Sequence, residues 1–306
     1  MADEVGWLQA HDGPEARLFQ KIAEQGHFAG QTRPTPTRQG IYATAPNGKL
    51  LASNNAVDPH SMADMLQRAL ARWEALETKQ RTVAKFPSGE RRRRGEFRRP
   101  PEGLVLKVNS RDLPRVGAAE EWRGEAWNQD FAWFTKEEAR QFFTTGDGAE
   151  AEVPAALVKR LARFHLVDNV RGQTWPPYSD GEVQRAELRS QVTATQGDLI
   201  SLRFAGASHC VAAGKWSIAG SRDGHQPSPQ QRGVQTRLLG HAEYDLEREA
   251  FVRFQLVAIG TRWGGTQYNG RSDDLQPSPV GFVFTLASDT AADTVAPAFW
   301  KVYPRW

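Results

Sequence analysis

The N-terminal quarter of the chain combines two stretches of helical hydrophobic spacing with a short stretch of strand-like alternation. The segment Asp12-Gly-Pro-Glu15, with its early proline and acid, is typical of a helix start, and Leu18, Phe19 and Ile22 then share one face. Residues 40–53 predict a β-hairpin around an Asn-Gly turn. Asp58-Pro59 begins a second amphipathic helix with apolar residues three, four and seven positions apart, namely Met62, Met65, Leu66, Ala69, Trp73 and Leu76.

The middle of the chain has mainly helical spacing. Residues 104–108 predict a short strand. Residues 122–143 are aromatic, and we expect a helix there, with Thr135 and Glu138 as a capping box and a buried stripe of Trp127, Phe131 and Phe134. A further helix begins at Val153-Pro154, with an inward face of Leu157, Leu161 and Phe164.

From about residue 186 the hydrophobic period changes to two, which is typical of strands with one buried face. Five strands are expected in hairpin order, joined in part by the polar segments 214–233 and 261–279, which we expect to be loops. One phase of the alternation predicts the core face: Leu188, Val192, Ile200, Leu202, Phe204, Val252, Phe254, Leu256, Phe282 and Phe284.

Together these patterns predict an α+β chain. We expect an N-terminal lobe over residues 1–78, a linker over 79–102, a mixed helical and aromatic segment over 103–166, and an antiparallel β domain over 167–306. Strands in hairpin order with one polar face favour a sandwich or a barrel for that domain.

Composition narrows the class of protein. Ten Trp and fifteen Phe among 306 residues exclude a disordered chain, and no apolar run is long enough to span a bilayer. Acidic residues near Met1 and the lack of an apolar segment after them predict a cytoplasmic protein without a secretory signal. The single cysteine, Cys210, excludes an internal disulfide and a zinc site built from cysteines.

The basic charge is concentrated in the linker. Residues 79–99 hold nine basic and two acidic residues, including the run Arg91, Arg92, Arg93 and Arg94, although the whole chain has a net charge of only +3. Such a run fits contact with nucleic acid or an anionic surface. It fits equally a solvated linker kept extended by self-repulsion, so both interpretations stay open.

A family resemblance rests on three phrases: residues 37–42 (TRQGIY), 126–133 (AWNQDFAW) and 165–173 (HLVDNVRGQ). With them the chain resembles uncharacterised bacterial proteins of the thioredoxin family, and the helix, hairpin and helix of residues 12–77 resemble the second half of that fold. The resemblance implies a partial thioredoxin-like lobe in which Pro34 or Pro36 precedes the first hairpin strand. The Cys-x-x-Cys half is missing from this chain, so the resemblance implies no redox role.

Candidate chemistry centres on His165 and Asp168, three residues apart where a helix gives way to a loop, with Arg171 close behind. Joined by His241 from the sheet, they could orient a substrate or bind a metal. The alternative is a helix-terminal histidine and a turn-capping aspartate. The seven histidines show no metal-ligand spacing, so neither a resident metal nor a cofactor is expected.

Two single residues are further candidates. Cys210 follows His209, which could lower the pKa of a thiol, but neighbours on a strand point to opposite faces, so a packed structural cysteine is the alternative. Trp133 lies off the expected helical stripe and could stack on a sugar or base, or belong to the core.

Three hypotheses on function follow. The leading one is a non-redox binding or interaction protein for a small molecule or a protein partner. The second is a hydrolase or metal-dependent enzyme that uses His165, Asp168 and His241, and the third is nucleic-acid contact through Arg91 to Arg94.

Overall fold

The computed structural model describes residues 8, 12–27, 38–56, 58–82, 100–115, 125–220, 226–290, 293 and 295–304. The chain divides into two compact units, Met1–Arg93 and Arg94–Trp306. The division falls inside the expected linker, and each unit is described by itself.

The N-terminal unit confirms the expected helix, hairpin and helix. Asp58 caps the long helix through a hydrogen bond of 2.8 Å that its carboxylate accepts from the backbone N–H of Ser61, and Gly48 turns the hairpin with a φ of +81°. The elements are α2 (Pro14–Glu24), β1 (Ile41–Thr44), β2 (Leu50–Asn54), α3 (Pro59–Glu74) and α4 (Thr78–Arg81), with β1 and β2 antiparallel.

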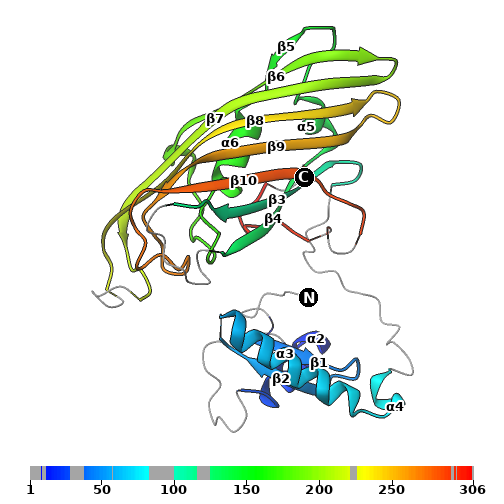
Figure 1. The fold of residues 1–306 in the computed structure, drawn as a ribbon, viewed down its shortest axis with the longest axis vertical. Helices are drawn as coiled ribbons and strands as arrows, with labels where there is room; N and C mark the ends of the chain where they lie inside the picture. Colours follow the sequence, from blue (N-terminus) through cyan, green and yellow to red (C-terminus); the bar gives the residue numbers. More distant parts are fainter. Residues whose placement is uncertain are drawn as a thin grey trace. The chain divides into compact units, whose positions relative to one another are not determined.

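The C-terminal unit is built on one antiparallel sheet of eight strands in the order β4-β3-β10-β9-β8-β7-β6-β5 (Figure 1). The strands are β3 (Leu104–Asp112), β4 (Trp127–Phe134), β5 (Glu150–Glu152), β6 (Val183–Gln196), β7 (Leu199–Trp216), β8 (Ser228–Asp245), β9 (Ala250–Trp263) and β10 (Ser278–Leu286). The other elements are α5 (Lys136–Arg140), α6 (Ala155–Phe164) and the 3₁₀ turn η2 (Asp180–Glu182).

The expected sandwich or barrel is wrong, because the described strands form one sheet with β4 and β5 at its two ends. Residues 103–166 are not a separate segment either, since β3 pairs with β10, with Phe284 opposite Val108. Periodicity shows which face of a strand is buried but not which distant strand it pairs with, so the pairing of β3 with β10 could not be predicted from the sequence.

The helix expected over residues 122–143 is also wrong. Trp127–Phe134 is strand β4, and only Lys136–Arg140 is helical, behind the capping box of Thr135 and Glu138. Residues 131–134 are all buried, so β4 lacks the alternation of a half-buried strand, and the spacing of its aromatic residues was mistaken for a helical stripe. Trp133, a candidate either for stacking on a sugar or base or for the core, is 1% exposed and packs in a buried cluster.

The core face of the sheet was predicted correctly at nine of ten positions. Phe204, Phe254 and Phe282 are buried with the other members, but Val252 is exposed. The register of β8 and β9 shifts between Glu243 and Tyr244, so Val252 is the extra residue of a β-bulge. The expected loops are also shorter, since β7 extends to Trp216 and β8 begins at Ser228.

The two faces of the sheet have different surroundings. Helix α6 packs on β6 and β7, and its Leu157 and Leu161 join the phenylalanines of the strands in one core, as predicted. Figure 1 shows α5 and α6 behind the strands, on what we call the inner face; the opposite face is the outer face. In the described part of the chain, no helix has the length and apolar character needed to cross a membrane.

Replacing Phe254 by alanine tests this core. Phe254 is 1% exposed and meets Phe142, Phe204 and Phe251 ring to ring, so we expect the free energy of unfolding to fall by about 3–5 kcal/mol in denaturant titration. The control Val252→Ala should cost less than about 1 kcal/mol, because the bulge turns Val252 to water. Equal losses at the two positions would contradict the assigned bulge.

Candidate functional site

His165, the C-cap of α6, lies between two buried polar side chains, Asp130 and Tyr303. We call these three residues the histidine cluster. The ring Nδ1 donates to the carboxylate of Asp130 at 2.8 Å, and Nε2 lies 2.9 Å from the Tyr303 hydroxyl. The second oxygen of Asp130 accepts the backbone N–H of Ala298 at 2.8 Å, and the Tyr303 hydroxyl accepts the backbone N–H of Trp133 at 3.1 Å.

This cluster joins the end of α6 and strand β4 to the C-terminal segment. The side chain of His165 is 0% exposed, and burial raises the pKa of Tyr303. Both ring nitrogens of His165 already have partners, so a substrate would have to displace one to reach them. The cluster therefore acts as a structural tie and not as an open acid–base site.

Asp168 belongs to a second, larger group at the end of the sheet where β3 and β9 finish and β10 begins. The group, which we call the arginine–aspartate cluster, contains three carboxylates and four guanidinium groups from β3, β9 and the loops beside them. Its members are Asp112, Asp168, Asp274, Arg115, Arg171, Arg262 and Arg271.

Arg271 is the centre of the arginine–aspartate cluster. Its Nε and Nη2 donate to the two oxygens of Asp168 at 2.8 and 2.7 Å, and its Nη1 and Nη2 donate to the two oxygens of Asp112 at 2.7 Å each. Nη1 also donates to Asp274 at 3.2 Å. All five N–H groups of this 0% exposed side chain are thus used, which is the condition for burying a guanidinium.

Electrostatics fix the charges in the cluster. Burial acts to raise the pKa of Asp112, but hydrogen bonding to Arg271 and the nearby positive charges outweigh it and hold that pKa below its ordinary value. The pKa of Asp274 is lowered in the same way, against burial, by Arg115 and Arg262. Although burial opposes it, the two carboxylates raise the pKa of Arg271. For Asp112, Asp274 and Arg271 the surroundings therefore favour the charged form.

The three residues of the expected enzyme site do not come together. His165 lies in the histidine cluster and Asp168 pairs with Arg271, whereas His241 lies exposed on the outer face of β8, between Arg203 and Gln255. Among the residues that the structure describes, no group of three His, Cys, Asp or Glu side chains is placed to hold a metal ion.

The remaining candidates have internal partners or fall outside the description. Arg171, expected to bind a ligand, donates from Nε to Asp112 at 3.0 Å and lies 3.1 Å from Asp274. Cys210 is buried, its sulfur lies 3.7 Å from the carbonyl oxygen of Ala162, and burial raises the pKa of its thiol to about 12, which favours the packed structural alternative. Arg91 to Arg94 lie outside the described residues.

Sequence reasoning missed the partners that define both clusters. Asp130 and Tyr303 are far apart in the chain, and Arg271 and Asp274 lie in a polar segment set aside as a loop. The one available signal was the charge of Arg271, Asp273 and Asp274, a few residues before a buried strand. Buried charge needs partners, but no spacing rule names partners 159 residues away, as Asp112 is from Arg271.

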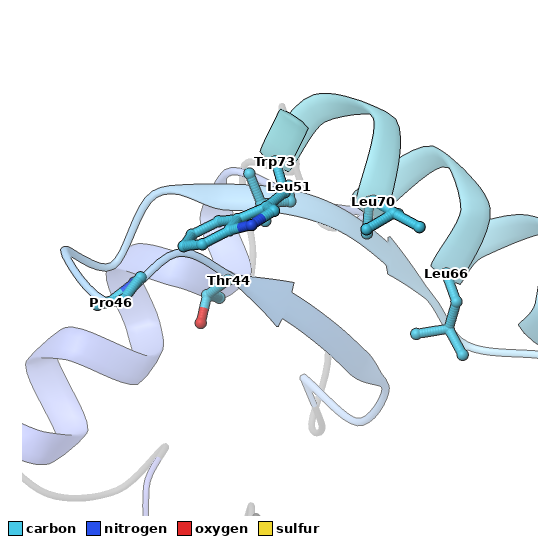
Figure 2. Close-up of a pocket in the computed structure, with 7 residues that line it drawn as sticks. Thr44, Pro46, Leu51, Leu66, Leu70 and Trp73 are labelled. Carbon is cyan, nitrogen blue, oxygen red and sulfur yellow. The ribbon is translucent and has the colours of Figure 1, made fainter. Parts of the chain in front are cut away.

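The N-terminal unit has an open apolar hollow between α3 and the hairpin (Figure 2). Leu66, Leu70 and Trp73 contribute to it from one stripe of α3, at spacings of four and three residues. The full lining is Thr44, Pro46, Leu51, Leu66, Ala69, Leu70 and Trp73. Sequence reasoning placed Leu66 and Trp73 on the apolar face of this helix but did not single out Leu70; Leu66 is 52% exposed and Leu70 56%.

No protein-family model, curated protein or solved structure matches the chain. The function therefore has to be inferred from the side chains themselves.

Replacing Arg271 by leucine tests the arginine–aspartate cluster. The change leaves Asp112 and Asp168 buried without their main partner, so we expect the free energy of unfolding at pH 7 to fall by about 3–5 kcal/mol. The matched control is Arg253→Leu, which removes an exposed pair with Glu243 at 3.7 Å and should cost less than about 1 kcal/mol.

The loss caused by Arg271→Leu should narrow as the pH falls. The folded pKa of Asp112 is lowered in the wild type, so its contribution is present above the ordinary aspartate pKa near 4 and disappears as pH falls through the folded value. In the variant, the Asp112 carboxylate lacks its main partner and is protonated at a higher pH than in the wild type. The cost of burying it unpaired is therefore lost at that higher pH. If the difference in the free energy of unfolding between the wild type and Arg271→Leu stays constant from pH 7 to pH 4, the buried carboxylate is not the source of that difference.

Proposed function

We propose that the chain is a non-redox binding protein that holds an apolar peptide segment of a partner in the hollow of its N-terminal unit. The single observation that carries the proposal is the hollow itself, in which Leu66 and Leu70 are more than half exposed beside the half-buried Trp73. Exposed aliphatic side chains gathered on one surface are typical of interaction sites.

The width of the apolar surface of α3 supports this proposal. Met65, Ala69 and Leu76 already bury one face of the helix against Leu51 and Ala52 of β2. The stripe of Leu66, Leu70 and Trp73 is a second apolar face. Trp73 packs partly against the core shared with the hairpin, whereas Leu66 and Leu70 stay more than half exposed. A helix with more apolar surface than its own unit covers is suited to binding a further partner.

The Trp73 end of the hollow is held in place. The Arg81 guanidinium lies 5.6 Å from the centre of the Trp73 ring, and its Nε donates to the carbonyl of Leu76 at 2.9 Å. These contacts restrict the indole and leave a positive charge at the rim. A fixed aromatic wall lowers the entropy cost of binding, because less has to be ordered when a partner arrives.

We also propose that this unit is a partial thioredoxin-like lobe. The order of α2, β1, β2 and α3 supports it, since it follows the second half of that fold. The chain's one cysteine lies in the other unit and is buried, so the proposed role is binding and not thiol exchange.

Peptide selection on the full chain tests this function. Displayed random twelve-residue peptides should yield apolar binders, and Leu70→Asp should weaken the selected peptides at least tenfold, about 1.4 kcal/mol, in fluorescence anisotropy. The control Ala71→Asp places the same charge one residue along the same helix, on exposed surface outside the hollow, and should change binding less than twofold.

Thermal denaturation checks that both variants remain folded, which the exposure of Leu70 and Ala71 leads us to expect. Selected peptides that bind the Leu70→Asp variant as tightly as the wild type would overturn the proposal, as would a selection that enriches only polar sequences.

A further inference from the structure

The outer face of the sheet carries an aliphatic patch on the C-terminal unit. Leu239 of β8, Val257 of β9 and Val283 of β10 lie directly side by side in one cross-strand row, and Ile259 lies two residues along β9. Leu239 is 66% exposed, Ile259 55%, Val283 40% and Val257 39%. We call these four residues the outer patch.

The outer patch is unexpected for a sheet of this kind. An antiparallel sheet with one packed face ordinarily turns polar side chains to water on the other. Here four neighbouring aliphatic side chains interrupt that pattern near the middle of an eight-stranded sheet. A cluster of exposed aliphatic residues ringed by polar ones marks an interaction surface, whereas single exposed residues do not.

Positive charge flanks the outer patch on β7 and β8. Arg237 is paired in register with Ile259, and Arg203 lies opposite His241 on the other side of the row. Within the described residues neither arginine has a carboxylate partner, since Arg203 donates instead to the neutral side chain of Gln191 at 2.6 Å. Arg189 and Arg253 also lie near the patch, but each is paired with a glutamate, Glu152 and Glu243, so the uncompensated charge is that of Arg203 and Arg237.

This charge selects between possible occupants. Two copies packed face to face would bring their arginines together, and the repulsion disfavours a dimer through this face. A partner with acidic residues beside apolar ones would complement both the rim and the patch.

The length of the outer patch fits an α-helix that lies across the strands. The row from Leu239 to Val283 crosses two inter-strand gaps, or about 10 Å. Apolar side chains seven residues apart on an α-helix are separated by about 10 Å along its axis. One helical stripe at positions i, i+4 and i+7 can therefore contact the whole row.

We propose that the outer face binds an acidic amphipathic helix of a partner protein, with its leucine-type stripe on Leu239, Val257, Ile259 and Val283 and its carboxylates toward Arg203 and Arg237. The surface lies on a different unit from the hollow, and its test is independent of that site.

Two matched helical peptides of eighteen residues test the proposal with the full chain. Both carry leucine at i, i+4, i+7 and i+11; one has glutamate at the flanking positions and the other has lysine. We expect the glutamate peptide to bind at least tenfold more tightly than the lysine peptide in fluorescence anisotropy, with affinity falling as salt rises.

Variants locate the contact. Leu239→Ser should weaken the glutamate peptide at least tenfold, and Arg237→Gln should weaken it and flatten its salt dependence. Leu246→Ser, which truncates an exposed leucine in the β8–β9 turn, is the matched control and should leave binding unchanged. Leu239 is two-thirds exposed, so its variant should keep the wild-type melting temperature.

Four outcomes would overturn the proposal. They are equal binding of the two peptides, unchanged binding by Leu239→Ser, a dimer in sedimentation that Leu239→Ser dissociates, and binding only to phosphatidylserine vesicles. The last two would assign the face to a second copy or to a lipid surface instead.

Discussion

The C-terminal unit depends on keeping one buried guanidinium fully paired. Arg271 lies in the loop between β9 and β10, yet its partners are Asp112 at the end of β3 and Asp168 in the loop after α6. One planar group thus joins three distant segments of the chain. Such a network adds little net stability when complete and costs several kcal/mol when one partner is missing, so it specifies the arrangement more than it stabilises it.

Buried side chains of two kinds, apolar and charged, fill the inner face of the sheet. Phenylalanines of β7, β9 and β10 fill its centre against α6, and the arginine–aspartate cluster occupies the end where β3 and β9 finish. The histidine cluster ties β4 and the end of α6 to the C-terminal segment. The side chains of both clusters are buried and pair mainly with one another, although Arg262 Nε has no hydrogen-bond partner among the described residues. The partner surfaces we propose therefore lie elsewhere, in the hollow and on the outer face.

The parts of the fold that depend on local pattern could be predicted from the sequence. The capped start of α3, the Asn-Gly turn and the buried phase of β6, β7 and β10 follow from residues close together in the chain. Strand β4 could not be identified, because residues 131–134 are buried on both sides and alternation is lost. The bulge at Val252 shifted the phase of β9 by one residue, which no propensity reveals.

The candidate site was predictable only in part, for a physical reason. His165 and Asp168 were singled out as polar residues at a helix end, but their partners come from β4, the C-terminal segment and the β9–β10 loop. Pairing across such separations is set by how the sheet assembles, and the pattern that places Asp112 inward does not show that Arg271 will meet it.

Amide hydrogen exchange of the Arg271→Leu variant tests the central role of this side chain most directly. Our account predicts at least tenfold faster exchange in residues 166–174 and 264–277, the two loops that Arg271 holds together, with wild-type protection in α2 and α3 of the other unit. Wild-type exchange rates in both loops would contradict the account, because it would show that these segments keep their arrangement without the guanidinium.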